Sequence, residues 1–104
     1  MNRIAVIAPL REGTEEEALA LLADGPPYDP AEAGLAAHWV FLSSSEVVFV
    51  FEGSFVENAV RELANDPVIS ATFARWGPLL VGPPRLAHER YRWPAWTEGE
   101  RALG

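Results

Sequence analysis

The stretch that most constrains the fold is residues 38–52, HWVFLSSSEVVFVFE, in which two β-prone runs flank a serine-rich turn. A two-residue turn at Ser44 and Ser45 predicts a hairpin with one face made by Leu42, Val40 and His38 opposite Val47, Phe49 and Phe51. The other face then carries Phe41, Trp39 and Ala37 opposite Val48, Val50 and Glu52. Ser-Ser is a poor pair for a tight turn, so a longer loop is also open. Both faces stay apolar if the register slips by one residue, so both must be covered.

Composition limits the class of protein. The chain of 104 residues suggests a single domain, residues 1–104, in which the tail 94–104 packs on the body or on a partner. Cysteine is absent, which removes disulfides and thiolate metal sites and fits a cytoplasmic location. Eight basic against fifteen acidic residues give a net charge of −7, which disfavours nucleic acid as a partner.

The apolar runs are short. None reaches the roughly 20 residues of a membrane span, and the run in MNRIAVIAPL is too short for a secretory signal. We therefore expect neither a membrane association nor a leader peptide.

The first part of the chain predicts a strand and a helix. Residues 3–9 are apolar at both parities, as in a central strand. The pattern from Thr14 to Glu17 predicts a capping box at the start of a helix that Gly25-Pro26-Pro27 ends. Asp29-Pro30 then predicts a single turn that closes at Gly34.

The second part predicts two helices and a last strand. Ser54 and Glu57 form a second capping-box pattern, followed by an apolar stripe made of Phe55, Val56, Ala59, Val60 and Leu63. Asn65-Asp66-Pro67 breaks this helix near Ala64 and caps another that runs to about Trp76, with Ile69, Phe73 and Trp76 on one face. Residues 85–93 predict a fourth strand, polar enough for a sheet edge or a cavity wall.

This order of elements predicts an α+β fold, the ferredoxin-like βαββαβ sandwich. It has a four-stranded antiparallel sheet with helices on one face. The helices cover only one of the two apolar faces, and an apolar sheet face is rarely left in water. We therefore expect a homodimer in which a second copy covers the open face.

The layout, the Asn65-Asp66-Pro67 break and the closing PPRLAHERYRW resemble the dimeric α/β-barrel superfamily. That group includes antibiotic-biosynthesis-type monooxygenases, EthD-like proteins and muconolactone-isomerase-like proteins. The resemblance spans residues 3–93 and implies the strand order 4-1-3-2, a dimeric barrel and a cavity inside the sheet or between sheet and helices. No catalytic signature of the family can be carried over residue by residue.

The two histidines, His38 and His88, are the candidate catalytic residues, because their side chains titrate near neutrality. In the implied barrel one subunit's second strand lies near its partner's fourth, so His38 and His88 from different subunits would line a shared cavity, with Arg90 as an anion anchor. The alternative is a histidine that is hydrogen-bonded at a strand end.

The candidate substrate-binding residues are Trp39, Glu52, Trp76, Arg90 and Tyr91. Glu52 would be a general base if buried, and a solvated strand end otherwise. Trp76 with Arg75 would pair with a ligand ring and carboxylate, or would be a core tryptophan beside a surface arginine. Four tryptophans suit either an aromatic pocket or dimer packing.

These features leave open whether the chain is an enzyme. One hypothesis is a cofactor-independent enzyme, of the monooxygenase, isomerase or cyclase type, that acts on a small organic molecule and uses neither a metal nor a cofactor. The alternatives are a barrel that binds a small molecule without turnover and a structural dimer.

Overall fold

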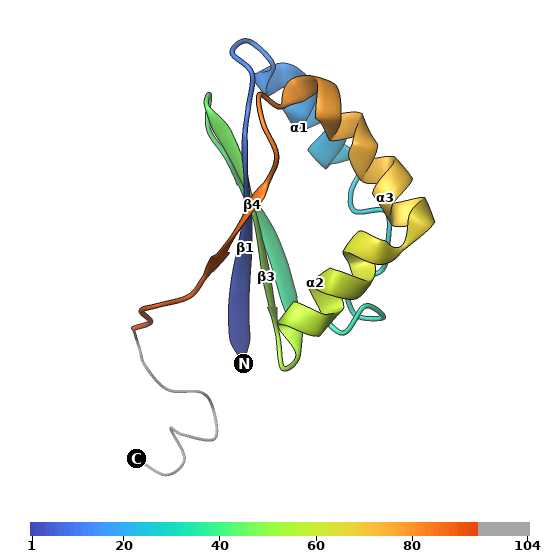
Figure 1. Cartoon of the computed structure of the whole chain (residues 1–104), viewed down its shortest axis with the longest axis vertical. Coiled ribbons are helices and arrows are strands. Elements are labelled where there is room, and N and C mark those ends of the chain that lie inside the picture. Colours follow the sequence, from blue (N-terminus) through green and yellow to red (C-terminus); the bar gives the residue numbers. More distant parts are fainter. Residues whose placement is uncertain (94–104) are drawn as a thin grey trace.

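The computed structural model describes residues 1–93 and shows one sheet covered on one face by helices (Figure 1). The predicted packing of the tail 94–104 lies outside the described residues. The strands are β1 (Asn2–Pro9), β2 (Ala37–Leu42), β3 (Glu46–Gly53) and β4 (Arg85–His88). The helices are α1 (Glu15–Ala23), α2 (Val56–Asn65) and α3 (Pro67–Phe73), and a 3₁₀ helix, η1 (Ala74–Leu79), continues α3.

The four strands lie in the order β2-β3-β1-β4, and every neighbouring pair is antiparallel. This confirms the ferredoxin-like fold and the expected strand order. The hairpin register is also as predicted, with His38 opposite Phe51 and Leu42 opposite Val47. The Ser-Ser turn is possible because the Ser43 hydroxyl accepts hydrogen bonds from the backbone N–H groups of Ser45 (3.2 Å) and Glu46 (3.1 Å).

The core lies between the sheet and the helices. The helix-covered face of the sheet carries Ile4, Ala8, Val47 and Phe51, each at most 4% exposed. The opposite face, hereafter the open face, carries Ala5, Ile7, Trp39, Val48, Val50 and Ala87, which are partly exposed, and Phe41, which is 59% exposed. Both faces of the central strands are therefore apolar, and only one is covered by residues 1–93.

Neither predicted capping box forms. Thr14 precedes α1, but its hydroxyl donates to the Arg11 carbonyl (2.7 Å) and makes no hydrogen bond to the helix. The second helix begins at Val56, so Ser54 lies in the preceding turn and Phe55, predicted in the apolar stripe, is 77% exposed. The pattern of residue types is present at both places. At Thr14 the hydroxyl binds the Arg11 carbonyl instead of a helical N–H group, and at Ser54 the helix begins one residue later than the pattern predicts.

The break between α2 and α3 is confirmed. The Asp66 carboxylate accepts from the backbone N–H groups of Val68 (2.9 Å) and Ile69 (3.2 Å), and Pro67 occupies the first turn of α3. The predicted face of this segment is confirmed too, because Ile69 and Trp76 are buried and Phe73 packs against both parts of the core. Figure 1 shows that α2 and α3 meet at an angle and so arch over the sheet.

The fourth strand is shorter than predicted. It pairs with β1 only over Arg85–His88, rather than over residues 85–93. Arg90 and Tyr91 therefore lie beyond the sheet ladder, in the segment that leaves the body in Figure 1. The sequence of residues 85–93 contains no proline or glycine that would have indicated an earlier end of the strand.

Candidate functional site

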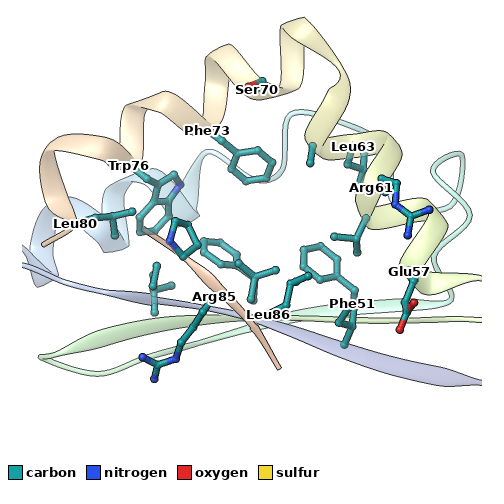
Figure 2. Close-up of a pocket in the computed structure, with 18 of the residues that line it drawn as sticks. Phe51, Glu57, Arg61, Leu63, Ser70, Phe73, Trp76, Leu80, Arg85 and Leu86 are labelled. Atoms are coloured by element: carbon teal, nitrogen blue, oxygen red, sulfur yellow. The ribbon is translucent and has the colours of Figure 1, made fainter. Parts of the chain in front are cut away.

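A cavity of about 730 Å³ separates the helix-covered face of the sheet from α2, α3 and η1 (Figure 2). We call it the main cavity. Its sheet side is formed by Ile4, Val6, Ala8, Val47, Phe49 and Phe51, and its helix side includes Val60, Leu63, Phe73 and Trp76. It exists because the bend at Pro67 lifts the centre of the helical layer from the sheet, while β4 covers little of the edge.

Aromatic rings form one end of the main cavity. The Phe49 ring meets Phe73 edge to face, with centroids 6.3 Å apart, and meets Trp76 in the same way at 5.3 Å. Such rings present both faces and edges to a bound molecule. The main cavity is therefore suited to a flat, largely apolar ligand.

Polar groups lie at the other end. Figure 2 shows Glu57 and Arg61 near Phe51, on the side opposite to Trp76 and Leu80. Glu57 and Arg61 are four residues apart on α2 and so share a helix face. His88, the last residue of β4, lies opposite Ile4 and also lines the main cavity.

The Glu57 carboxylate and the His88 ring are in direct contact. The Nδ1 atom of His88 lies 3.2 Å from Oε1 of Glu57. This is an ion-pair contact when the ring is protonated, so the Glu57 carboxylate can stabilise positive charge on His88.

A second cavity of about 160 Å³ lies on the other side of the aromatic rings, toward α1 and β2. We call it the second cavity. His38 and Tyr28 line it, and His38 stacks on Phe51 with the ring centroids 4.5 Å apart. The Nδ1 atom of His38 lies 2.9 Å from the Val50 carbonyl oxygen, which accepts its hydrogen.

The structure does not bring the two histidines together. His38, Phe51, Ile4 and His88 form one row across the sheet, so the histidines lie at opposite edges on the helix-covered face. His88 lines the main cavity and His38 the second cavity. A dimer closed by the open face would therefore have neither ring inside its barrel, and the shared histidine site is not formed by this geometry.

Of the candidate substrate-binding residues, only Trp76 lines the main cavity. Trp39 borders the second cavity, but its ring lies under the Arg3 guanidinium, 5.4 Å from centroid to Cζ. Glu52 is on the open face, where its carboxylate is 2.6 Å from Nε of Arg3. Arg90 and Tyr91 are exposed and line neither cavity.

Glu57 and Arg61 were missed by the sequence reasoning. Glu57 was assigned to a capping box, which would have turned it toward the helix end, and Arg61 was not singled out. The available signal was their spacing of four residues beside the buried Val56, Ala59 and Leu63. That spacing places two charges at the border of an apolar helix face, although the pattern alone does not show that a cavity lies there.

Within residues 1–93, no three His, Cys, Asp or Glu side chains gather closely enough to hold a metal ion. No helix in this part has both the length and the apolar character needed to cross a membrane.

No family model matches the sequence, and no curated protein matches it either. Solved structures do match the fold. An antibiotic biosynthesis monooxygenase superposes with a TM-score of 0.66 at 10% identity, covering 88% of this chain and 99% of the other. Tetracenomycin F2 cyclase from Streptomyces glaucescens, a type-II polyketide cyclase, gives 0.67 at 17% identity, covering 88% and 95%.

The fold is that of the antibiotic biosynthesis monooxygenase-like proteins. A protein of unknown function from Nitrosomonas europaea also shares it, with a TM-score of 0.61 at 22% identity over 92% of this chain and 98% of the other. The resemblance stated from the sequence is thus confirmed for the fold. At such identities a shared fold does not fix a reaction, which has to be argued from the site.

Proposed function

We propose that the protein binds a small, largely apolar, ring-containing organic molecule in the main cavity and transfers protons on it without a cofactor. The observation that carries this proposal is the contact between His88 and Glu57 at the polar end of an otherwise apolar cavity. Isomerisation and cyclisation both proceed through removal of a proton beside a carbonyl group. The polyketide cyclase that shares the fold supports this class of reaction.

Each polar residue has a distinct role in this proposal. His88 takes the proton, and the Glu57 carboxylate beside its ring stabilises the imidazolium that forms. Arg61, four residues along α2, supplies positive charge to the oxygen that becomes negative as the proton leaves. The aromatic residues hold the ring system in place.

Proton exchange on a model ketone tests the catalytic role. We would incubate the protein with 2-tetralone in D₂O and follow loss of the α-proton signal by NMR. A positioned base contributes about 10²- to 10⁴-fold, so the wild type should accelerate exchange and His88→Gln should lose most of the acceleration. Glu57→Gln should be impaired as well, whereas Glu62→Gln, an exposed change on the same helix, should match the wild type. Equal rates in wild type and His88→Gln would contradict the proposal.

A second function, binding without turnover, is favoured by one observation. The side chains of His88 and Glu57 are 41% and 61% exposed, which is more than is usual for groups that act in a dry site. In that case 2-naphthol, a flat probe of similar size, binds by equilibrium dialysis, but exchange on 2-tetralone stays at the rate in buffer.

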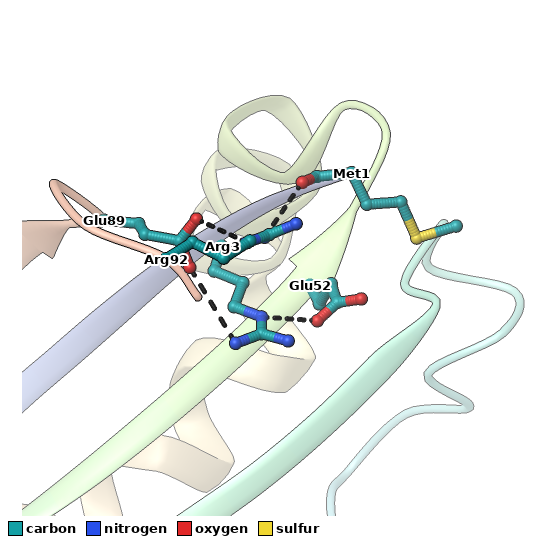
Figure 3. Close-up of polar contacts among 5 residues, drawn as sticks. All are labelled: Met1, Arg3, Glu52, Glu89 and Arg92. Atoms are coloured by element: carbon teal, nitrogen blue, oxygen red, sulfur yellow. Dashed lines mark hydrogen bonds and ion pairs between the residues drawn. The ribbon is translucent and has the colours of Figure 1, made fainter. Parts of the chain in front are cut away.

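We also propose that the protein is a homodimer whose subunits meet through the open face. In support of this, the open face is apolar along β1, β2 and β3, and Phe41 is 59% exposed. Charges at one end of this face are paired within the chain (Figure 3). Arg3 contacts Glu52 at 2.6 Å and Glu89 at 3.9 Å, and Nε of Arg92 donates to Glu89 at 2.9 Å. Paired charges are less costly to bury than free ones.

Light scattering across a dilution series tests the dimer. The expected mass is twice the 11.4 kDa of one chain. Val50→Asp places an unpaired charge in the middle of the open face and should shift the mass toward one chain, whereas Glu62→Gln should not. A wild type that stays at the mass of one chain at micromolar concentration would contradict the dimer. A cytoplasmic location remains a prediction that rests on the absence of cysteine.

A further inference from the structure

The main cavity and the second cavity share one wall. Phe49, Phe73 and Trp76 line both cavities, and we call these three residues the aromatic wall. The aromatic wall consists of side chains, so the main cavity and the second cavity are separated by rings and not by a helix or strand. The space on either side could therefore become continuous if one ring changed its rotamer.

Phe73 is the member of the aromatic wall that is best placed to move. It is the last residue of α3, and the chain tightens into the 3₁₀ helix η1 directly after it. Phe73 therefore lies at a helix end, where its backbone is less constrained than in the middle of a helix. Phe73 is only partly buried, whereas Trp76 is 9% exposed and Phe49 is held within the central strand β3.

The second cavity carries hydrogen-bonding groups of its own. The buried hydroxyl of Tyr28 has no hydrogen-bond partner among the described residues. Burial raises the pKa of Tyr28, so the hydroxyl keeps its proton at neutral pH and can donate. His38 binds the Val50 carbonyl through Nδ1, which leaves Nε2 as the acceptor of its neutral ring.

We propose that the second cavity is a subsite for the far end of an elongated ligand whose other end occupies the main cavity, with Phe73 as the gate between them. This rests on the proposed function, because the reacting end of the ligand lies beside His88. The backbones of His38 and His88 are three strand spacings apart, which is about 14 Å. Phe51 and Ile4 lie between them in that row, so a ligand that reaches both cavities passes through the aromatic wall instead and has to span at least that distance. The ligand class is therefore a flat molecule of several fused rings with an oxygen at the end near Tyr28.

Two probes of different length test this subsite. We would measure binding of 2-naphthol, which has two fused rings, and of 2-hydroxyanthraquinone, which has three, by equilibrium dialysis. Val40→Phe and Leu22→Phe each fill the second cavity, and neither residue lines the main cavity; because Val40 lies opposite Phe49 of the aromatic wall, Leu22→Phe, which fills the space from α1, is the check on effects passed through that ring. Val81→Phe adds the same volume at an exposed position that lines neither cavity and serves as the matched control.

The expected result is selective loss of the longer probe. Either filling variant should weaken 2-hydroxyanthraquinone by about tenfold or more and leave 2-naphthol within about twofold, because a ring that is excluded from an apolar site loses its whole burial energy. Phe73→Ala should tighten the longer probe relative to the shorter one. Val81→Phe should bind both probes as the wild type does.

The outcomes separate this inference from the proposed function. If 2-naphthol binds but the longer probe does not, or binds equally well to the filling variants, the subsite is refuted and the main cavity stands. If neither probe binds the wild type, the proposed function and the subsite fall together.

Discussion

The cap at the start of α3 allows a sharp test of how this fold is held together. The Asp66 carboxylate accepts from two backbone N–H groups, Val68 at 2.9 Å and Ile69 at 3.2 Å, that have no partner within the helix. Removal of such a cap costs about 1 kcal/mol, within a range of roughly 0.5–2 kcal/mol. Two acceptor contacts at good distances place Asp66→Ala in the upper half of that range.

The measurement is thermal unfolding by circular dichroism at one fixed protein concentration. A loss of about 1 kcal/mol lowers Tm by about 4–8 °C in a domain of this size. Asp66→Asn keeps a side-chain acceptor and should lose much less. Thr14→Ala and Ser54→Ala occupy the two capping-box patterns in which no side-chain cap is formed, so each should change Tm by less than Asp66→Ala does.

The order of the Tm losses among these four variants shows whether side-chain caps stabilise the starts of the helices. If Thr14→Ala or Ser54→Ala cost as much as Asp66→Ala, the side-chain contacts at the three helix starts would not explain their stability. A loss for Asp66→Asn that equals the loss for Asp66→Ala would show that charge, rather than hydrogen bonding, is what the site requires.

Three further changes have expected outcomes. Gly53→Ala should destabilise the protein in urea unfolding, because a Cβ at Gly53 would lie 2.9 Å from the Gly34 carbonyl oxygen; unchanged stability would contradict this close approach. Val47→Ala should cost about 2 kcal/mol in urea unfolding, since Val47 is fully buried; unchanged stability would argue against its place in the core. Tyr28→Phe should stabilise the ligand-free protein by about 1 kcal/mol by removing an unpartnered hydroxyl. Because burial raises the pKa of Tyr28 above 10.0, the unfolded state loses this proton first, so unfolding free energy should fall above about pH 10 in the wild type and fall less in Tyr28→Phe.

The fold could be predicted well because its strongest signals are periodic. Alternation along residues 37–53 fixed the hairpin register, and the Asn65-Asp66-Pro67 break carried both a helix end and a helix start in three residues. The helix start at Thr14 was predicted correctly and that at Ser54 was one residue early, but neither capping box forms, because the pattern of residue types does not fix where the hydroxyl points. The fourth strand was predicted too long: pairing stops at His88 although β1 extends two residues further, to Asn2.

The candidate site was predictable only in part. His88 and Trp76 were singled out and both line the main cavity, but the partner of His88 is Glu57, which lies 31 positions earlier on α2. Such a contact depends on how closely a helix approaches a sheet edge. His38 and His88 both lie on the helix-covered face, and strand pairing, which the sequence pattern of one strand does not contain, decides that they end in different cavities.

The bend between α2 and α3 also determines what size of molecule the protein can hold. Because α3 starts where α2 stops, the direction of Phe73 and Trp76 depends on how many residues α2 contains. Removal of one residue from α2 would rotate everything that follows by about 100° about the helix axis. The lining of the cavity therefore depends on the length of α2 as well as on the residues that follow it, because such a rotation would turn Phe73 and Trp76 away from the sheet.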